Sequence, residues 1–207
     1  MLNIVVLVSG GGTNLQALID AQSNGIIKNG KITHVIADRE GAYALTRAEN
    51  VGIATKVIAR KSFDSIKEHN KALLKELLDC KADLIVLAGY LSILDKEVTD
   101  AFANKIINVH PSLIPAFCGD GFYGLRVHKA ALDKGVKVTG ATVHFVNEVT
   151  DGGAIILQKC VDIQNDDTPE TLQKRVMEQA EWELLPKAVS LICEGRVKVI
   201  DNKTQIF

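Results

Sequence analysis

Asn108 and His110 are the first residues whose types and spacing suggest chemistry. They lie in the apolar, mostly β-branched run at residues 106–110, which predicts a strand that Pro111 and Pro115 prevent from continuing. Side chains alternate along a strand, so both would project from the same face where the strand gives way to a loop. Open α/β sheets place their chemistry there, and an amide beside an imidazole can donate hydrogen bonds and carry a proton. An Asn and a His that merely cap loop carbonyls would show the same spacing.

A glycine-rich turn at residues 9–14 indicates a second polar site. It follows an apolar run at 3–8 and precedes apolar residues at helical spacing, so its backbone N–H groups lie at the positive end of a helix, where anions bind. Thr13 and Asn14 add side-chain donors. The turn lacks both the G-x-G-x-x-G spacing of a dinucleotide site and the Gly-Lys-Ser/Thr of a P-loop, which favours a single phosphate monoester. The alternative is a tight turn that binds no ligand.

His144 and Asp151 are further candidates in the second half of the chain. The run 138–146 alternates as a strand that carries His144 and Thr142 on one face. The following turn, residues 147–153, is longer than a hairpin requires and places Asp151 beside two glycines. Because an Asp in a turn usually caps local backbone groups, Asp151 taken alone is interpreted as structural.

The elements that must position these residues alternate between strand and helix. This alternation predicts an α/β fold with a Rossmann-like, doubly wound, mostly parallel sheet and right-handed crossovers. The fully apolar run at 84–88 is typical of a strand that helices cover on both faces. The predicted strands span residues 3–8, 32–37, 54–58, 84–88, 106–110, 138–146 and 155–158. The predicted helices follow the glycine turn and span 43–50, 65–78, 96–103 and 128–132, with a long one from 168 towards 185.

Four segments carry more specific expectations. Pro186 should kink the last long helix or start a new turn, and residues 197–200 and 203–206 should pair as a terminal hairpin. In the loop at 116–125, aromatic residues alternate with three glycines, so the loop either covers a ligand or packs its aromatics against the body. The helix at 65–78 should bury its apolar side, formed by Ile66, Leu73, Leu74, Leu77 and Leu78.

Composition bounds the class of protein. A chain of 207 residues with 47% hydrophobic residues can form one domain with its own core, and a net charge of -1 argues against a general nucleic-acid binder. No apolar run approaches the roughly 18 to 20 residues of a membrane span, and no signal-peptide pattern begins the chain, so a cytoplasmic protein is expected. The cysteines form no CxxC pair, so we expect no metal or redox site, and reduced, mostly buried thiols at Cys80, Cys118, Cys160 and Cys193.

Several motifs occur together in an informative order. They are Val-Ser-Gly-Gly-Gly-Thr-Asn-Leu-Gln at 8–16, Leu-Ala-Gly-Tyr-Leu at 87–91, Asn-Val-His-Pro-Ser-Leu-Ile-Pro at 108–115, Gly-Ala-Thr-Val-His-Phe-Val at 140–146, Thr-Asp-Gly-Gly at 150–153 and Ile-Ile-Leu-Gln at 155–158. Each is weak alone, but in this order and at these spacings they are specific. Over nearly its whole length the chain resembles the phosphoribosylglycinamide formyltransferase family of purine biosynthesis, also called glycinamide ribonucleotide transformylase.

The resemblance implies a reaction and a catalytic trio. The family transfers the formyl group of 10-formyltetrahydrofolate to the amine of glycinamide ribonucleotide, on the way to IMP. By resemblance, Asn108, His110 and Asp151 are catalytic, and His144 supports their geometry. The residue types fit, because attack on the formyl carbon creates an oxyanion that Asn108 and a protonated His110 can stabilise. Asp151 can hold His110 charged and relay the proton to the departing folate nitrogen, with no covalent intermediate and no metal.

The same resemblance implies the binding residues. Residues 1–104 would form the ribonucleotide-binding half and 105–207 the catalytic and folate-binding half of a single domain, which would be a monomer or a homodimer. The implied ribonucleotide contacts are Gly11, Gly12, Thr13, Asn14, Pro111 and Glu181. The implied contacts of the folate cosubstrate are Tyr90, Leu91, Ser92, Ile93, Leu94, Val146 and Thr150.

The chain departs from the family's pattern at three places. Ser92 stands where some members have an arginine, Ala116 stands where they have a lysine, and the loop at 117–125 is longer. These departures leave the catalytic residue types intact but change which side chains can hold the folate and the phosphate. His128 is a further candidate for a substrate-loop contact.

Other acceptors and one other class of protein compete with this interpretation. Methionyl-tRNA formyltransferase shares the catalytic arrangement but normally adds a tRNA-binding domain, and a formyltetrahydrofolate hydrolase normally adds an N-terminal regulatory domain. We expect neither domain here. A sugar-nucleotide formyltransferase is a further alternative, because a fold does not determine the acceptor. A non-catalytic module that binds a phosphate ligand would keep that binding after loss of His110 or Asp151.

Overall fold

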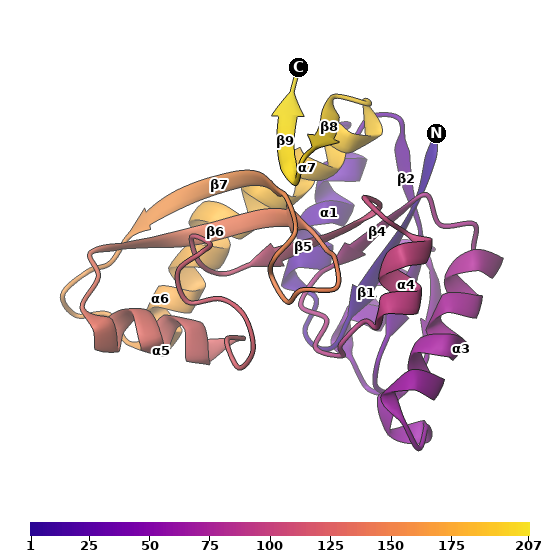
Figure 1. Cartoon of the computed structure of the whole chain (residues 1–207), viewed down its shortest axis with the longest axis horizontal. Helices are drawn as coiled ribbons and strands as arrows, with labels where there is room; N and C mark the ends of the chain where they lie inside the picture. The colour runs from indigo at the N-terminus through magenta and orange to yellow at the C-terminus, as the bar shows by residue number, and fades with distance from the viewer.

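A seven-stranded mixed sheet forms the centre of the computed structural model, which describes residues 1–207 (Figure 1). The strand order is β3-β2-β1-β4-β5-β6-β7, in which β1 to β5 pair in parallel and β6 runs antiparallel to both its neighbours. The predicted α/β class and mostly parallel sheet are therefore confirmed. The strands are β1 (Leu2–Val8), β2 (Gly30–Ala37), β3 (Ala54–Val57), β4 (Leu84–Leu87), β5 (Ile106–His110), β6 (Val138–Phe145) and β7 (Ile155–Asp162).

Helices cover both faces of the sheet. Alternate residues of β1 enter two cores: Ile4, Val6 and Val8 join the larger, with 34 buried side chains, and Val5 and Leu7 the smaller, with 12. Residues of α1, α2, α6 and α7 close the larger core, and residues of α3 and α4 close the smaller. The helices are α1 (Thr13–Ser23), α2 (Tyr43–Glu49), α3 (Ile66–Asp79), α4 (Lys96–Ala101), α5 (Leu125–Lys134), α6 (Pro169–Val176) and α7 (Trp182–Cys193).

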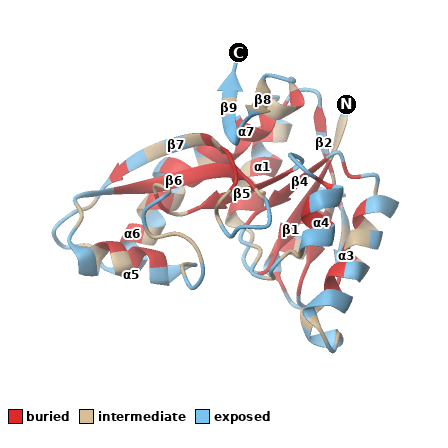
Figure 2. Cartoon of the chain, viewed as in Figure 1, coloured by how far each residue is buried: buried red, intermediate tan, exposed pale blue.

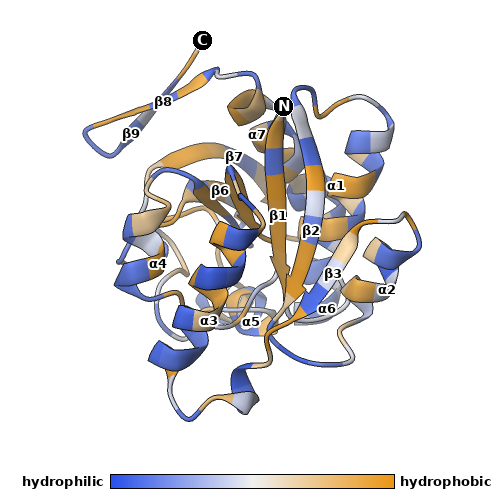
Figure 3. Ribbon diagram, turned by 90° about the vertical axis from the view of Figure 1, so that its right-hand side faces the viewer, coloured by the Kyte–Doolittle hydropathy of each residue, from blue (hydrophilic) through white to orange (hydrophobic).

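The burial of the central strands explains their composition. Ile4 to Val8 of β1 are fully buried, and Figure 2 shows buried strands between helices whose outer faces are exposed. In Figure 3, β1 is hydrophobic over most of its length. A strand buried on both faces cannot alternate apolar and polar side chains, so its sequence reads as a continuous apolar run.

Two predictions about burial are wrong. In α3, only Leu73 and Leu77 of the expected apolar side are buried, whereas Ile66 and Leu78 are exposed, because the buried stripe of this surface helix is narrower than its apolar sequence. Of the four cysteines only Cys193 is buried. Cys160 is exposed on the edge strand β7, and the other two are partly exposed.

The last long helix is irregular before its proline. A π-helical segment, Met177–Glu181, joins α6 to α7, and a capping box between Thr168 and Thr171 starts α6. Pro186 lies inside α7 and starts no new helix. The expected irregularity therefore lies upstream of the proline, in a π turn of the kind that often occurs at functional sites.

The terminal hairpin is present as predicted. β8 (Val197–Ile200) and β9 (Lys203–Ile206) pair antiparallel across Asp201 and Asn202. None of the helices combines the length and the apolar character that a membrane span requires.

Candidate active site

Pairing between β5 and β6 brings Asn108 beside His144. In this antiparallel register Asn108 lies opposite His144, and His110 lies opposite Thr142. The amide nitrogen of Asn108 is 3.2 Å from Nε2 of His144. The predicted common face of Asn108 and His110 is thus extended by a residue that comes 36 positions after Asn108.

Asp151 reaches the same place through a strained loop between β6 and β7. One of its carboxylate oxygens is 3.5 Å from Nδ1 of His110, and the other is 3.5 Å from Nε2 of His144. Asp151 has a φ of 55°, a left-handed conformation that is uncommon for residues other than glycine. At Gly153, an added Cβ would lie 1.8 Å from the carbonyl oxygen of Phe145, so only glycine fits there. The structure therefore brings Asp151 to the two histidines rather than leaving it as a local cap.

Backbone carbonyls determine which ring nitrogens carry hydrogen. Nε2 of His110 lies 2.9 Å from the carbonyl oxygen of Phe117, and Nδ1 of His144 lies 2.8 Å from that of Phe145. Each of these nitrogens must donate, because a carbonyl only accepts. In neutral His144, Nε2 is then free to accept from Asn108, and this contact orients the amide. In neutral His110, Nδ1 faces Asp151 without a proton.

Burial makes His110 a weaker base. Its side chain is almost inaccessible, and this burial lowers the pKa below the ordinary 6.5, although Asp151 and the Phe117 carbonyl favour the charged form. Burial thus favours the neutral form of His110, while Asp151 favours the charged form. That Asp151 holds His110 protonated during the reaction stays a prediction.

Asp151 is held as an anion. Burial alone would raise the pKa of this carboxyl, but the two nearby histidines and the hydrogen bond from the backbone N–H of Gly119 keep the pKa below 3.8. The Gly119 N–H donates to the carboxylate over 2.8 Å. Three separate segments of chain therefore stabilise one negative charge.

The long loop reaches the site through its backbone rather than its aromatic rings. The carbonyl of Phe117 and the N–H of Gly119 make the contacts with His110 and Asp151. The rings of Phe117 and Phe122 lie 6.5 Å apart and are half-buried, whereas Tyr123 is exposed and packs under the guanidinium of Arg126. The two phenylalanines therefore pack against one another within the loop, and whether the loop covers a ligand stays a prediction.

The glycine turn forms the second polar site, at the start of α1. Gly12 precedes α1 with a φ of 72°, and an added Cβ would lie 2.6 Å from the Cβ of Ala44, so the turn requires glycine here. The guanidinium of Arg47 donates to the carbonyl of Gly11 over 2.8 Å and fixes the turn from outside. Thr13 contacts the sulfur of Met177 in the π-helical segment.

Glu181 lies behind this turn and is paired with Asn14. The Asn14 amide nitrogen donates to Glu181 over 2.7 Å, while Oδ1 of Asn14 is buried without a partner. Burial raises the pKa of Glu181 to about 7, because the single hydrogen bond from Asn14 only partly offsets the loss of hydration. The turn and the π segment thus bring together a polar pair with unused hydrogen-bonding capacity.

The segment after β4 exposes apolar side chains near the turn. Leu91 and Ile93 are 51% and 67% exposed, whereas Tyr90 and Leu94 pack against the smaller core, and burial raises the pKa of Tyr90. The hydroxyl of Ser92 donates to Asp38 over 2.7 Å. Of the predicted folate contacts, Leu91 and Ile93 are therefore the most accessible.

The remaining predicted residues lie in or near the loops that contact His110 and Asp151. Val146 packs against the smaller core, Thr150 donates to Asp120 over 3.0 Å, and Pro111 is partly exposed directly after β5. His128 is buried on α5, with neither ring nitrogen paired, and burial lowers its pKa to about 4. His128 thus lies inside the fold beside the loop rather than on the loop's surface.

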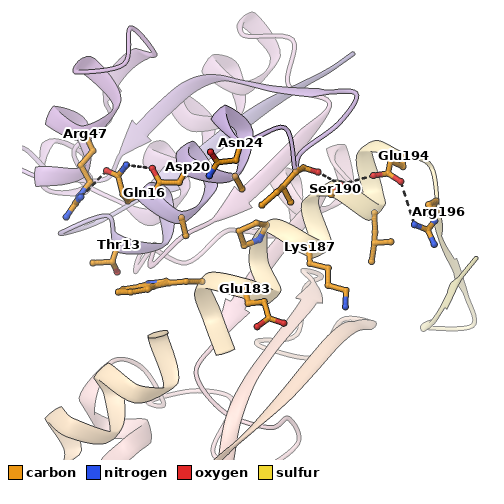
Figure 4. Close-up of a pocket in the computed structure, with 16 residues that line it drawn as sticks. Thr13, Gln16, Asp20, Asn24, Arg47, Glu183, Lys187, Ser190, Glu194 and Arg196 are labelled. Carbon is orange, nitrogen blue, oxygen red and sulfur yellow. Dashed lines mark hydrogen bonds and ion pairs between the residues drawn. The ribbon is translucent and has the colours of Figure 1, made fainter. Parts of the chain in front are cut away.

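Two surface cavities adjoin the site without including the trio. One, of about 750 Å³, runs between α1 and α7 from Thr13 and Trp182 to Glu194 (Figure 4). The other, of about 770 Å³, is lined by Leu91, Ser92 and Ile93 together with Arg39, Arg60 and Lys61. Asn108, His110 and Asp151 line neither of them. No group of three or more His, Cys, Asp or Glu side chains is gathered as metal ligands would be.

Known proteins share both the sequence and the fold. The formyl transferase family model matches residues 2–189. The phosphoribosylglycinamide formyltransferase of Haemophilus influenzae is 43% identical over 98% of this chain and 92% of its own length. A glycinamide ribonucleotide transformylase of Symbiobacterium toebii is 40% identical, with a TM-score of 0.94 over 100% of this chain and 94% of that one.

The chain belongs to the phosphoribosylglycinamide formyltransferase family. The enzyme is a formyltransferase of purine biosynthesis, as the resemblance of its motifs implied. A formyltetrahydrofolate deformylase of Pseudomonas syringae pv. tomato has the same fold, at 26% identity and a TM-score of 0.88, over 100% of this chain and 66% of that one.

Some contacts of the enzyme's site have no counterpart in the sequence analysis. Ser9 accepts from the N–H of Leu91 over 2.8 Å, and Asn70 donates to the carbonyl of Ile93 over 3.0 Å, so both fix the segment after β4. Asp38, directly after β2, accepts a hydrogen bond from the Ser92 hydroxyl. Ser9 and Asp38 each follow an apolar strand directly, and this position at the carboxyl edge of a parallel sheet is the signal that would have found them.

Proposed function

We propose that the enzyme transfers the formyl group of 10-formyltetrahydrofolate to the amine of glycinamide ribonucleotide by direct attack, without a covalent enzyme intermediate. The convergence of Asn108, His110 and Asp151 with His144 carries this proposal. These residues supply an oriented amide, an imidazole and a fixed carboxylate within 3.2–3.5 Å contacts of one another. Such a set suits acyl transfer, in which one oxyanion and one proton must be managed.

The proposed proton movement starts from a neutral His110 beside an ionised Asp151. Nδ1 of His110, which faces the Asp151 carboxylate, accepts the proton that the amine loses as it attacks the formyl carbon. His110 then becomes an imidazolium that pairs with Asp151 and favours the oxyanion through its positive charge, while the Asn108 amide donates a hydrogen bond to the oxyanion. When the tetrahedral intermediate collapses, the same proton passes to the departing folate nitrogen. The products are formylated ribonucleotide and tetrahydrofolate, and the enzyme recovers its initial state.

The ribonucleotide is proposed to bind at the glycine turn. Backbone N–H groups at the start of α1, with Thr13, suit a phosphate monoester. Glu181 and the unpaired oxygen of Asn14 suit the hydroxyl and amine groups of the remainder, and Pro111 borders the path to His110. Hydroxyl and amine donors of the substrate would replace the hydrogen bonds to water that Glu181 loses on burial.

The cosubstrate is proposed to lie against Leu91 and Ile93, with Val146 and Thr150 on the opposite side. The crevice between the ends of β1 and β4 is where the strand order reverses, the usual ligand position in open α/β sheets. On this arrangement, residues 1–104 mainly bind the ribonucleotide and 105–207 mainly supply the catalytic groups. There are two exceptions. Glu181, in the second half, would contact the ribonucleotide, and the 90–94 segment, in the first half, would contact the folate.

An acceptor panel tests the proposal. The enzyme is mixed with 10-formyltetrahydrofolate and with glycinamide ribonucleotide, initiator methionyl-tRNA or no acceptor, and folate absorbance is followed. We expect turnover with the ribonucleotide alone. Turnover without an acceptor would indicate hydrolysis, the activity named for the similar deformylase, and activity only with tRNA would reassign the substrate.

A further inference from the structure

The C-terminal hairpin of β8 and β9 contacts the loop that carries Asp151. The Asn202 side chain donates to the carbonyl of Gly152 over 3.3 Å, and the Thr204 hydroxyl donates to the carbonyl of Ile155 over 2.6 Å. Figure 1 shows the hairpin standing beside the start of β7. The last residues of the chain therefore meet the backbone on either side of the point where the loop joins the sheet.

Both carbonyls are next to residues of the active site. Gly152 directly follows Asp151, and Ile155 pairs with His144 where the register of β6 and β7 shifts. β7 is the edge strand, so its outer backbone groups have no strand neighbour in the sheet. The hairpin provides hydrogen-bond donors on this open side.

The hairpin is itself attached firmly to the body. Val197 and Val199, on one face of β8, pack against the larger core. Arg196, just after α7, exchanges hydrogen bonds with Phe207: its Nε donates to the Phe207 carbonyl over 2.6 Å, and its own carbonyl accepts from the Phe207 N–H over 3.1 Å. The hairpin is therefore held in place by the larger core and by the residue that follows α7.

The loop requires such support because its conformation is costly. Asp151 lies in the left-handed region, with a φ of 55°, and the loop residues 147–150 are exposed. The Asp151 carboxylate contacts both histidines at 3.5 Å, so a small displacement of the loop would lengthen both contacts together. Displacements of about 1 Å at reacting groups can cost roughly a hundredfold in rate.

We propose that Asn202 and Thr204 are positioning residues that hold Asp151 against His110 and His144. This inference rests on the proposed role of Asp151 in formyl transfer. The hairpin acts on the loop from outside the sheet and touches no substrate.

A double variant, Asn202→Gly with Thr204→Val, tests this role. Asn202 has a φ of 55°, which glycine also adopts, and valine keeps the shape of threonine, so both donors are lost while the hairpin is retained. The matched control is Lys203→Ala with Gln205→Ala, two exposed residues of the same β9 strand. The measurements are kcat and KM for the ribonucleotide against pH, hydrogen–deuterium exchange of residues 146–154, and Tm.

The double variant should lower kcat by about tenfold while KM for the ribonucleotide changes less than about twofold. The acid limb of its profile of kcat against pH should move to higher pH, because an Asp151 carboxyl with looser contacts binds a proton more readily. Exchange at 146–154 should be faster, with Tm close to that of the control. A double variant that matches the control in kcat, pH profile and exchange would overturn the proposal. If the parent transferred no formyl group to the ribonucleotide, the proposed function would fail, and faster exchange at 146–154 would still support the hairpin's hold on the loop.

Discussion

Asp151 and Glu181 are both carboxylates shielded from solvent, yet the pKa of Asp151 is lowered and that of Glu181 is raised to about 7. Asp151 contacts two histidines and the N–H of Gly119, whereas Glu181 receives one amide hydrogen bond from Asn14. Burial opposes ionisation of both, so the titratable neighbours that only Asp151 has decide the outcome.

The difference indicates that the hydrogen-bonding surroundings of one carboxylate are complete before a ligand binds, whereas those of the other are not. The protein alone completes the surroundings of Asp151, as a group that must act as an anion requires before substrate arrives. The surroundings of Glu181 remain incomplete, since Oδ1 of its partner Asn14 has no hydrogen-bond donor. A ligand with hydroxyl or amine donors would complete them.

Replacing Asp151 should have the largest effect. Asp151→Asn keeps the shape but removes the charge that pairs with the His110 imidazolium, so kcat should fall by about 10³-fold or more. KM for the ribonucleotide should change little, because the turn at residues 11–14 is untouched. Steady-state kinetics beside Asp64→Asn, an exposed carboxylate on the opposite half, would check this. Equal losses in both variants would contradict the assigned role.

Removing the oriented amide should cost less. Asn108→Ala deletes one donor to the oxyanion, and losses of about 10²–10³ in kcat are typical for such donors. His144 keeps its tautomer through the Phe145 carbonyl, so the histidines should stay in place. A comparison with Asn108→Asp separates hydrogen bonding from shape: if the aspartate variant retained full activity, the amide would not be an oxyanion donor.

Part of this arrangement could be predicted from the sequence. The spacing of Asn108 and His110 on a strand predicted a shared face, and the βα alternation predicted the sheet, because both depend on local periodicity. The contacts of Asp151 could not be predicted in this way. They depend on a loop in a left-handed conformation, on the Gly119 N–H and on register between distant strands.

The ribonucleotide side shows the same limit. The glycines at 11 and 12 predicted a turn, but the pairing of Asn14 with Glu181 crosses 167 positions and depends on the π-helical segment that turns Glu181 inward. The exposure of Leu78 and Cys160 was likewise decided by the neighbours that each element has, rather than by its own hydrophobicity.

Replacing Glu181 should have two smaller effects of opposite sign. Stability near neutral pH should rise, and affinity for the ribonucleotide should fall. Its pKa is raised in the folded state, so its contribution to folding is full below the unfolded pKa of 4.5 and is lost as pH rises through about 7. The loss at alkaline pH is about 3 kcal/mol. Glu181→Gln removes this loss, and its amide can donate to the unpaired oxygen of Asn14.

The free energy of unfolding of Glu181→Gln in urea should therefore stay nearly level from pH 4.5 to pH 7, where that of the parent declines. KM for the ribonucleotide should rise by about tenfold, since the charged acceptor is lost. Glu183→Gln, an exposed neighbour two residues on, serves as the control. A parent and variant with the same pH dependence over this range would show that burial does not raise the pKa of Glu181.

The most direct measurement is a carbon-13 NMR titration of the side-chain carboxyl groups between pH 3 and pH 9, with signals assigned from Asp151→Asn and Glu181→Gln. The account predicts that the Asp151 signal titrates with a pKa below 3.8, while the Glu181 signal titrates near pH 7 and shifts when the ribonucleotide is added. An Asp151 that takes up a proton at or above the pH at which Glu181 does would contradict the assignment of Asp151 as the preformed anion of the reaction.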